Sequence, residues 1–168
     1  MMSAVRFAAV LAMIAVLGGC MGPESRLGDY RSQAEQIHDE VVGMTSSYEV
    51  KGEPVIESSL RVEDTYSGTA RDSDPAYWQI VDNRSYGETS MAIVAGETIA
   101  DFLASDGWVA AHGDLSNERA TVTDLRKTID GAEWHIRLVY PSRQGSTRTN
   151  IAVLIMSPWT AKGAATGR

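Results

Sequence analysis

Cysteine occurs once in this chain of 168 residues, at position 20. The residues that follow Cys20 therefore contain no intramolecular disulfide, and packing alone must stabilise their fold. Residues 20–168 number 149, which is enough for one domain with a substantial hydrophobic core. Because no internal repeat and no composition shift divides them, we expect a single domain.

The segment before Cys20 has the organisation of an export signal. A single positive charge, Arg6, precedes the apolar run Phe7–Leu17, and small residues follow it. This run has about eleven residues, within the range of a signal peptide, whereas a helix that spans a bilayer needs roughly twenty. The pattern thus predicts a secretory signal over residues 1–19 rather than a permanent transmembrane helix.

The segment Leu17-Gly18-Gly19-Cys20 resembles the lipobox of bacterial lipoproteins. The resemblance implies that the Cys20 thiol carries a diacylglyceryl group and that cleavage occurs just before it. Two or three acyl chains such as palmitate, each burying methylenes at about 0.8 kcal/mol, would hold the protein in a bilayer. We therefore expect a lipid-anchored protein of the cell envelope on the extracytoplasmic side of the cell membrane; an ordinary secreted protein whose cysteine is incidental is the alternative.

Charge restricts the partners of the exported chain. The sequence has 15 basic and 22 acidic residues, and loss of Arg6 with the signal leaves 14 against 22. This negative balance disfavours nucleic acid and anionic lipid surfaces as general partners.

Two segments have helical periodicity. In the first, from about Asp29 to Thr45, apolar residues recur at steps of three and four; this stripe comprises Leu27, Tyr30, Ala34, Ile37, Val41 and Met44. It also fits a short coiled-coil seam, although core packing is the better interpretation. The second helix is expected from Thr89 or Ser90, as N-cap, to about Ser105, with Asp106-Gly107 ending it.

The other periodic segments are expected to be strands. One or two short strands are expected first, from the runs Ser59–Val62 and Tyr77–Val81, which a polar loop over residues 67–74 joins. Four more are predicted at Trp108–His112, Ala120–Thr128, Trp134–Tyr140 and Thr149–Ser157. Asp130-Gly131 forms the turn between the second and third of these, and the last is apolar on both faces, which is typical of a central strand.

Together these elements predict an α+β fold, an antiparallel sheet of about five to six strands with two helices packed on one face. The expected organisation is a signal peptide over 1–19, a lipidated tether over 20–27, one domain over 28–160 and a loose tail over 161–168. The segments Asp106–Trp108, Trp134–Tyr140 and Ile155–Pro158 resemble those of small surface lipoproteins of actinobacteria. The chain departs from that pattern at Trp159, where related proteins often have a cysteine.

No catalytic or metal-binding motif is present in the sequence. Histidines occur at 38, 112 and 135, and none has the spacing of a metal site. His38 is expected on a hydrated helix flank, and His112 with the nearby Asp114 and Ser116 lacks a nucleophile motif. We therefore predict no catalytic residue, no metal and no cofactor.

Four residues are candidates for contact with a ligand. His135 and Arg137 project from the same face of their strand, and Trp108 and Trp159 lie beside strands. An exposed tryptophan beside tyrosines would indicate a surface that binds a glycan or a partner protein. The leading hypothesis is a non-catalytic binding or interaction module for an envelope protein or small ligand. The alternatives are an envelope hydrolase whose site is assembled from distant residues, with His112 or His135 among them, and a purely structural protein.

Overall fold

The computed structural model describes residues 25–62, 70–113, 115–143 and 146–163. Within these ranges the helices are α1 (Leu27–Gly43) and α2 (Thr89–Ser105). The strands are β1 (Val55–Val62), β2 (Pro75–Ser85), β3 (Val109–Ala110), β4 (Ala120–Ile129), β5 (Ala132–Pro141), β6 (Asn150–Met156) and β7 (Thr160–Ala161). The predicted signal peptide and Cys20 lie outside the described residues.

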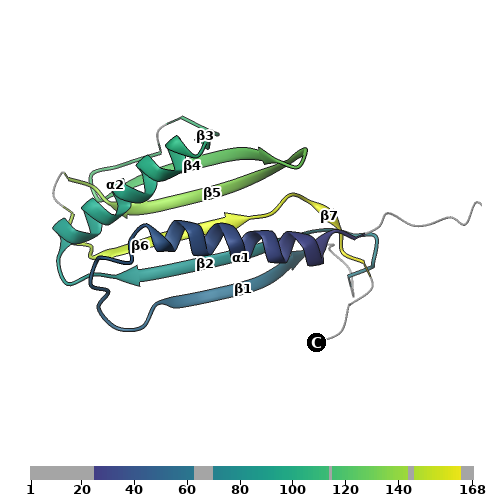
Figure 1. Ribbon diagram of the computed structural model, residues 1–168, viewed down its shortest axis with the longest axis horizontal. Helices are drawn as coiled ribbons and strands as arrows, with labels where there is room; N and C mark the ends of the chain where they lie inside the picture. The colour runs from purple at the N-terminus through teal and green to yellow at the C-terminus, as the bar shows by residue number, and fades with distance from the viewer. Residues whose placement is uncertain (1–24, 63–69, 114, 144–145, 164–168) are drawn as a thin grey trace, which may run out of the picture.

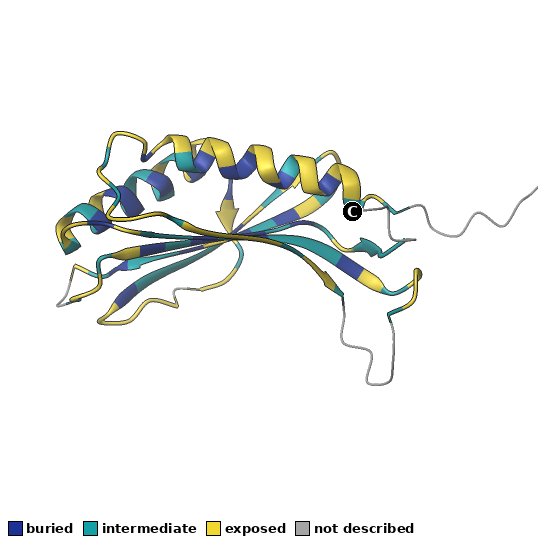
Figure 2. Ribbon diagram, turned by 90° about the horizontal axis from the view of Figure 1, so that it is seen from below, coloured by how far each residue is buried: buried dark blue, intermediate teal, exposed yellow. Residues whose placement is uncertain are grey.

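The strands form one antiparallel sheet in the order β1-β2-β6-β5-β4-β3, and β7 pairs with the start of β2. Both helices cover the same face of this sheet (Figures 1 and 2). The predicted α+β fold is thus confirmed, and the two-residue strands β3 and β7 bring the sheet to seven strands. As predicted, β6 is central, between β2 and β5.

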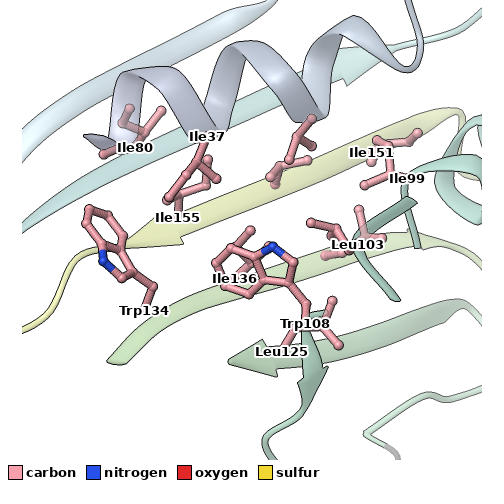
Figure 3. Packing of buried hydrophobic residues seen from close by; sticks show 14 of the residues in the cluster. Ile37, Ile80, Ile99, Leu103, Trp108, Leu125, Trp134, Ile136, Ile151 and Ile155 are labelled. Carbon is pink, nitrogen blue, oxygen red and sulfur yellow. The ribbon is translucent and has the colours of Figure 1, made fainter. Parts of the chain in front are cut away.

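The core lies between the helices and the sheet. The α1 stripe buries Tyr30, Ala34, Ile37 and Val41, and α2 buries Ile99 and Leu103 among others. The facing side chains come from alternate positions of the central strands: Trp134, Ile136 and Leu138 of β5, and Ile151, Val153 and Ile155 of β6. Figure 3 shows Trp134, Ile136, Ile151 and Ile155 among them. Met44 of the predicted stripe is 41% exposed because α1 ends at Gly43.

The sequence predicted the C-terminal end of α2 correctly but not the capping of its N-terminal end. Its N-cap is Glu88, with no side-chain capping bond, so the predicted capping by Thr89 or Ser90 is wrong. The Ser90 hydroxyl donates instead to the Glu88 carboxylate at 3.2 Å. The predicted stop is confirmed, because Gly107 has φ +87° and the Trp108 N–H bonds back to the Leu103 carbonyl at 3.0 Å.

Gly96 allows α2 to approach the sheet closely. A Cβ at this position would overlap the ring of Tyr140 on β5. The glycine that weakens the helix in isolation is therefore needed for its packing.

The first and last of the described residues lie together beside β7. The Ser25 hydroxyl donates to the Lys162 carbonyl at 3.2 Å, and the Lys162 N–H donates to the Asp74 carbonyl at 2.8 Å. Since Ala161 pairs with Pro75, the sheet extends into the stretch where the sequence analysis placed a loose tail. Of the described helices, neither is long and apolar enough to cross a membrane.

Candidate functional site

Neither described helix covers the opposite face of the sheet, which we call the open face (Figure 2). Strand register places its side chains in rows across the sheet. One row runs through Arg126, His135, Met156 and Gln79. The next runs through Asp124, Arg137, Leu154 and Val81. The half-exposed apolar side chains of β6 thus have charged side chains of β4 and β5 beside them.

A β-bulge between β6 and β7 directs Trp159 to the open face. Met156 pairs with Gln79 and Thr160 with Ala76, so residues 157–159 lie opposite residues 77–78. One extra residue reverses the alternation of side chains. Pro158, which has no N–H to donate, lies within this bulge.

Ser157 fixes the bulge through its side chain. Its hydroxyl accepts the Trp78 N–H at 2.7 Å and donates to the Pro158 carbonyl at 3.1 Å. The Ser157 N–H also donates to the Trp78 carbonyl at 2.9 Å. Ser157 is 3% exposed, so its hydroxyl is structural rather than available to a ligand.

A hollow of about 300 Å³ lies where the bulge meets the open face. We call it the open-face cleft; its lining residues are Tyr77, Glu133, His135, Met156, Ser157, Pro158 and Trp159. Trp159 is 57% exposed and meets Tyr77 edge to face, with ring centroids 4.6 Å apart. The cleft therefore has an aromatic wall on one side.

The opposite wall of the cleft is polar. His135 Nε2 lies 3.2 Å from the Glu133 carboxylate, and Arg126 lies 3.5 Å from the other oxygen of the same carboxylate. All three side chains are between 39% and 50% exposed. They can therefore donate and accept hydrogen bonds at the cleft.

A smaller hollow of about 70 Å³ continues the cleft along the sheet and shares His135 and Met156 with it. Here Arg137 binds the Asp124 carboxylate through two bonds of 2.6 and 2.8 Å. The Arg137 guanidinium lowers the pKa of Asp124, and the charges of His112 and His135 act in the same direction. Asp124 is thus held ionised between two histidines.

No family model, no curated protein and no solved structure matches this chain. Among the four residues singled out in the sequence, His135 and Trp159 meet in the cleft. Arg137 lies in the adjoining hollow. Trp108 is apart from them, 4% exposed in the core (Figure 3), at a groove of about 260 Å³ between the helices.

Sequence reasoning missed Tyr77, Glu133 and Met156 as lining residues. Tyr77 and Met156 belong to predicted strands, and Glu133 directly precedes one. A search for charged or aromatic residues on the same side as His135 could have found Glu133, two positions earlier. The approach of Tyr77 to Trp159 depends on the bulge, which alternation alone does not reveal.

His38 corrects the sequence interpretation, which placed it on a hydrated flank. It is 8% exposed, and its Nε2 lies 2.7 Å from the Asp82 carboxylate of β2, which also binds Arg84 at 2.9 Å. The hydrogen bond to Asp82 raises the pKa of His38 against the effect of burial. His38 is buried between α1 and the sheet because the Asp82 carboxylate of β2 lies beneath it and binds its ring.

The cleft offers aromatic and hydrogen-bonding side chains to a molecule that enters it. The Ser157 hydroxyl at the cleft accepts one hydrogen bond from the Trp78 N–H and donates another to the Pro158 carbonyl. The described residues contain no group of His, Cys, Asp and Glu that could hold a metal ion. His135 and Glu133 are left as an exposed acid–base pair without a nucleophile beside them.

Proposed function

We propose that this chain is a non-catalytic binding module of the cell envelope, anchored through acylated Cys20, with its ligand site in the open-face cleft. The observation that carries the binding role is the exposed Trp159, packed edge to face on Tyr77, opposite the polar wall of Glu133 and His135. A volume of about 300 Å³ lies at the lower end of the range for small-molecule sites. A small ligand or one unit of a polymer fits such a site.

A sugar ring is the ligand class that suits these walls best. Its apolar C–H face can pack on the exposed indole of Trp159, and its hydroxyls can bond the carboxylate of Glu133 and the imidazole of His135. The surrounding charges balance, since Arg126 and Arg137 accompany Glu133 and Asp124. This balance favours a neutral polyhydroxyl ligand over a strongly charged one.

Titration of the chain from residue 21 with purified cell-wall oligosaccharides tests the binding role, with calorimetry as the measurement. We expect Trp159→Ala to weaken binding by roughly tenfold or more, because a stacked aromatic contributes about 1–3 kcal/mol. Val109→Ala, at an exposed apolar residue of the short strand β3, is the control and should bind normally. If Trp159→Ala binds like the parent chain, the cleft is not the site.

The proposed anchor rests on the lipobox, and the position of Ser25 limits how far the domain could lie from it. Because Ser25 bonds Lys162 beside β7, residues 20–24 would span at most about 18 Å. The end of the sheet that carries the cleft would then lie close to the bilayer. Cys20→Ala should move the protein from the membrane to the soluble fraction, and retention in the membrane would exclude anchoring through this thiol.

A hydrolase is the second candidate, favoured by the contact of His135 with Glu133 at 3.2 Å. This pair could activate a water molecule toward a bound substrate. Mass spectrometry of oligosaccharides incubated with the protein separates the two functions. Cleavage that disappears in His135→Ala would establish the hydrolase, whereas binding without products supports the module.

A further inference from the structure

The outer edge of β1 is open among the described residues. β1 is the last strand on its side of the sheet and pairs only with β2. Its residues Val55, Ile56 and Leu60 are 58%, 50% and 38% exposed. Residues 55–62 contain neither the lysine nor the proline that commonly block an edge strand.

Two opposite charges lie along this edge on the open face. Register places Glu57 beside Val81 and Arg61 beside Tyr77. Neither the Glu57 nor the Arg61 side chain forms an ion pair or hydrogen bond with another described residue. The two charges are therefore available to a strand that pairs with β1.

We propose that β1 pairs antiparallel with β1 of a second copy, about a twofold axis at Ser59. In this register Glu57 of each copy faces Arg61 of the other, which gives two symmetric ion pairs. On the opposite face of the sheet, Ile56 of each copy faces Val62 of the other. The contact is isologous, and it joins the two sheets into one continuous sheet.

The charge pattern selects this register over its neighbours. In an antiparallel pair, two facing residues direct their N–H and C=O groups either both toward the shared edge or both away from it, and the two kinds of pair alternate along the strand. The twofold axis must therefore pass through a residue position, so neighbouring registers differ by one residue in the position of the axis. Centred on Ser58, Glu57 would face Ser59 and Arg61 would face Val55. Centred on Leu60, Arg61 would face Ser59, so only the Ser59 centre forms both ion pairs.

Analytical ultracentrifugation of the chain from residue 21 over a range of concentrations tests the pairing. All described contacts lie within residues 25–163, so this chain keeps the whole fold. The wild-type chain should dimerise reversibly. Glu57→Arg and Arg61→Glu should each raise the dissociation constant by about tenfold or more, because each places like charges opposite each other. Glu53→Arg, the same charge change just before β1, is the matched control and should dimerise like the wild type.

Mixing the two variants gives the decisive measurement. One then carries arginine at both positions and the other glutamate at both, so a mixture should form a heterodimer although neither variant pairs with itself. Circular dichroism of each variant checks that the fold is intact. A wild-type chain that stays monomeric at every concentration overturns the proposal and leaves the edge for a strand of another protein. A mixture that fails to associate, or a Glu57→Arg chain that dimerises normally, overturns it as well.

Discussion

Asp82→Asn should reveal how much the charged cluster beneath α1 contributes to stability. Asp82 is 1% exposed, and its carboxylate binds His38 at 2.7 Å and Arg84 at 2.9 Å. Removing one member of a buried ion pair costs about 3–5 kcal/mol, because the remaining charge stays buried. The side chains of His38 and Arg84 are 11% and 16% exposed, so water relieves part of this cost. We expect a loss of about 3 kcal/mol, a large fraction of the roughly 5–15 kcal/mol of a typical domain.

The same cluster predicts how stability varies with pH. The pKa of His38 is raised in the folded state. Its contribution to the free energy of unfolding is therefore fully present below the unfolded pKa of about 6.5, and it is lost as pH rises through the folded pKa. The pKa of Asp82 is lowered by its bonds to His38 and Arg84, which outweigh the opposing effect of burial. The contribution of Asp82 to the free energy of unfolding is present above its unfolded pKa of about 3.9, and it is lost as pH falls through its folded pKa. The pair should therefore stabilise the fold most between about pH 4 and 6.5.

Urea unfolding at several pH values measures both effects. Asp39→Asn is the control, because Asp39 also contacts His38, at 3.3 Å, but its side chain is 84% exposed. An exposed pair contributes at most about 1 kcal/mol, so this variant should keep most of the stability and the pH profile. In Asp82→Asn the stability should no longer fall as pH rises above about 6.5. A loss below about 1 kcal/mol with an unchanged profile would refute a buried, coupled His38–Asp82 pair.

Four further variants test the packing and the bulge. Gly96→Ala should cost about 1–2 kcal/mol in urea unfolding, since the new methyl overlaps the facing ring, whereas Gly28→Ala, with open space at its Cβ, should gain up to about 1 kcal/mol. Tyr86→Phe should leave stability within about 1 kcal/mol of the parent or raise it, because the buried hydroxyl has no hydrogen-bond partner among the described residues. Deletion of Pro158 removes the extra residue of the bulge and should protect Trp159 from acrylamide quenching; unchanged quenching would contradict the assigned register.

Periodicity predicted most of the fold because the same residues that create it also fill the core. The alternation of Trp134, Ile136 and Leu138 fixed the buried face of β5. Asp130-Gly131 fixed the hairpin before it, with φ of +50° and +77° at the two residues. These signals are local, so a single sequence contains them completely.

The errors arose where a distant partner decides the structure. His38 lies on a polar stretch of α1, and only Asp82, 44 positions later, explains its burial. Ala161 continues the sheet because the start of β2 extends past the end of β6 and offers it a partner. Neither relation leaves a local signal in the sequence.

The two tryptophans chosen from the sequence show the same limit at the candidate site. Trp108 follows the glycine that ends α2, and the backbone bond from its N–H to Leu103 accompanies its burial under the helix. Trp159 follows Ser-Pro, and the hydroxyl of Ser157 takes the place of a ladder bond. Both residues lie beside strands, so proximity to a strand could not separate a core residue from an exposed one.

The bulge is the feature that turns an ordinary antiparallel sheet into one with a cleft. If the alternation of β6 continued unbroken, Trp159 would share the helix face with Ile155, which is fully buried, and no aromatic wall would exist on the open face. The extra residue opposite Tyr77 and Trp78 moves Trp159 to the other side. Tyr77 lies on the open face with or without the bulge, because its pairing with β1 places it beside Arg61. A one-residue insertion thus brings together an aromatic pair and the polar side chains of β5, while Ser157 bonds Trp78 and keeps the sheet continuous.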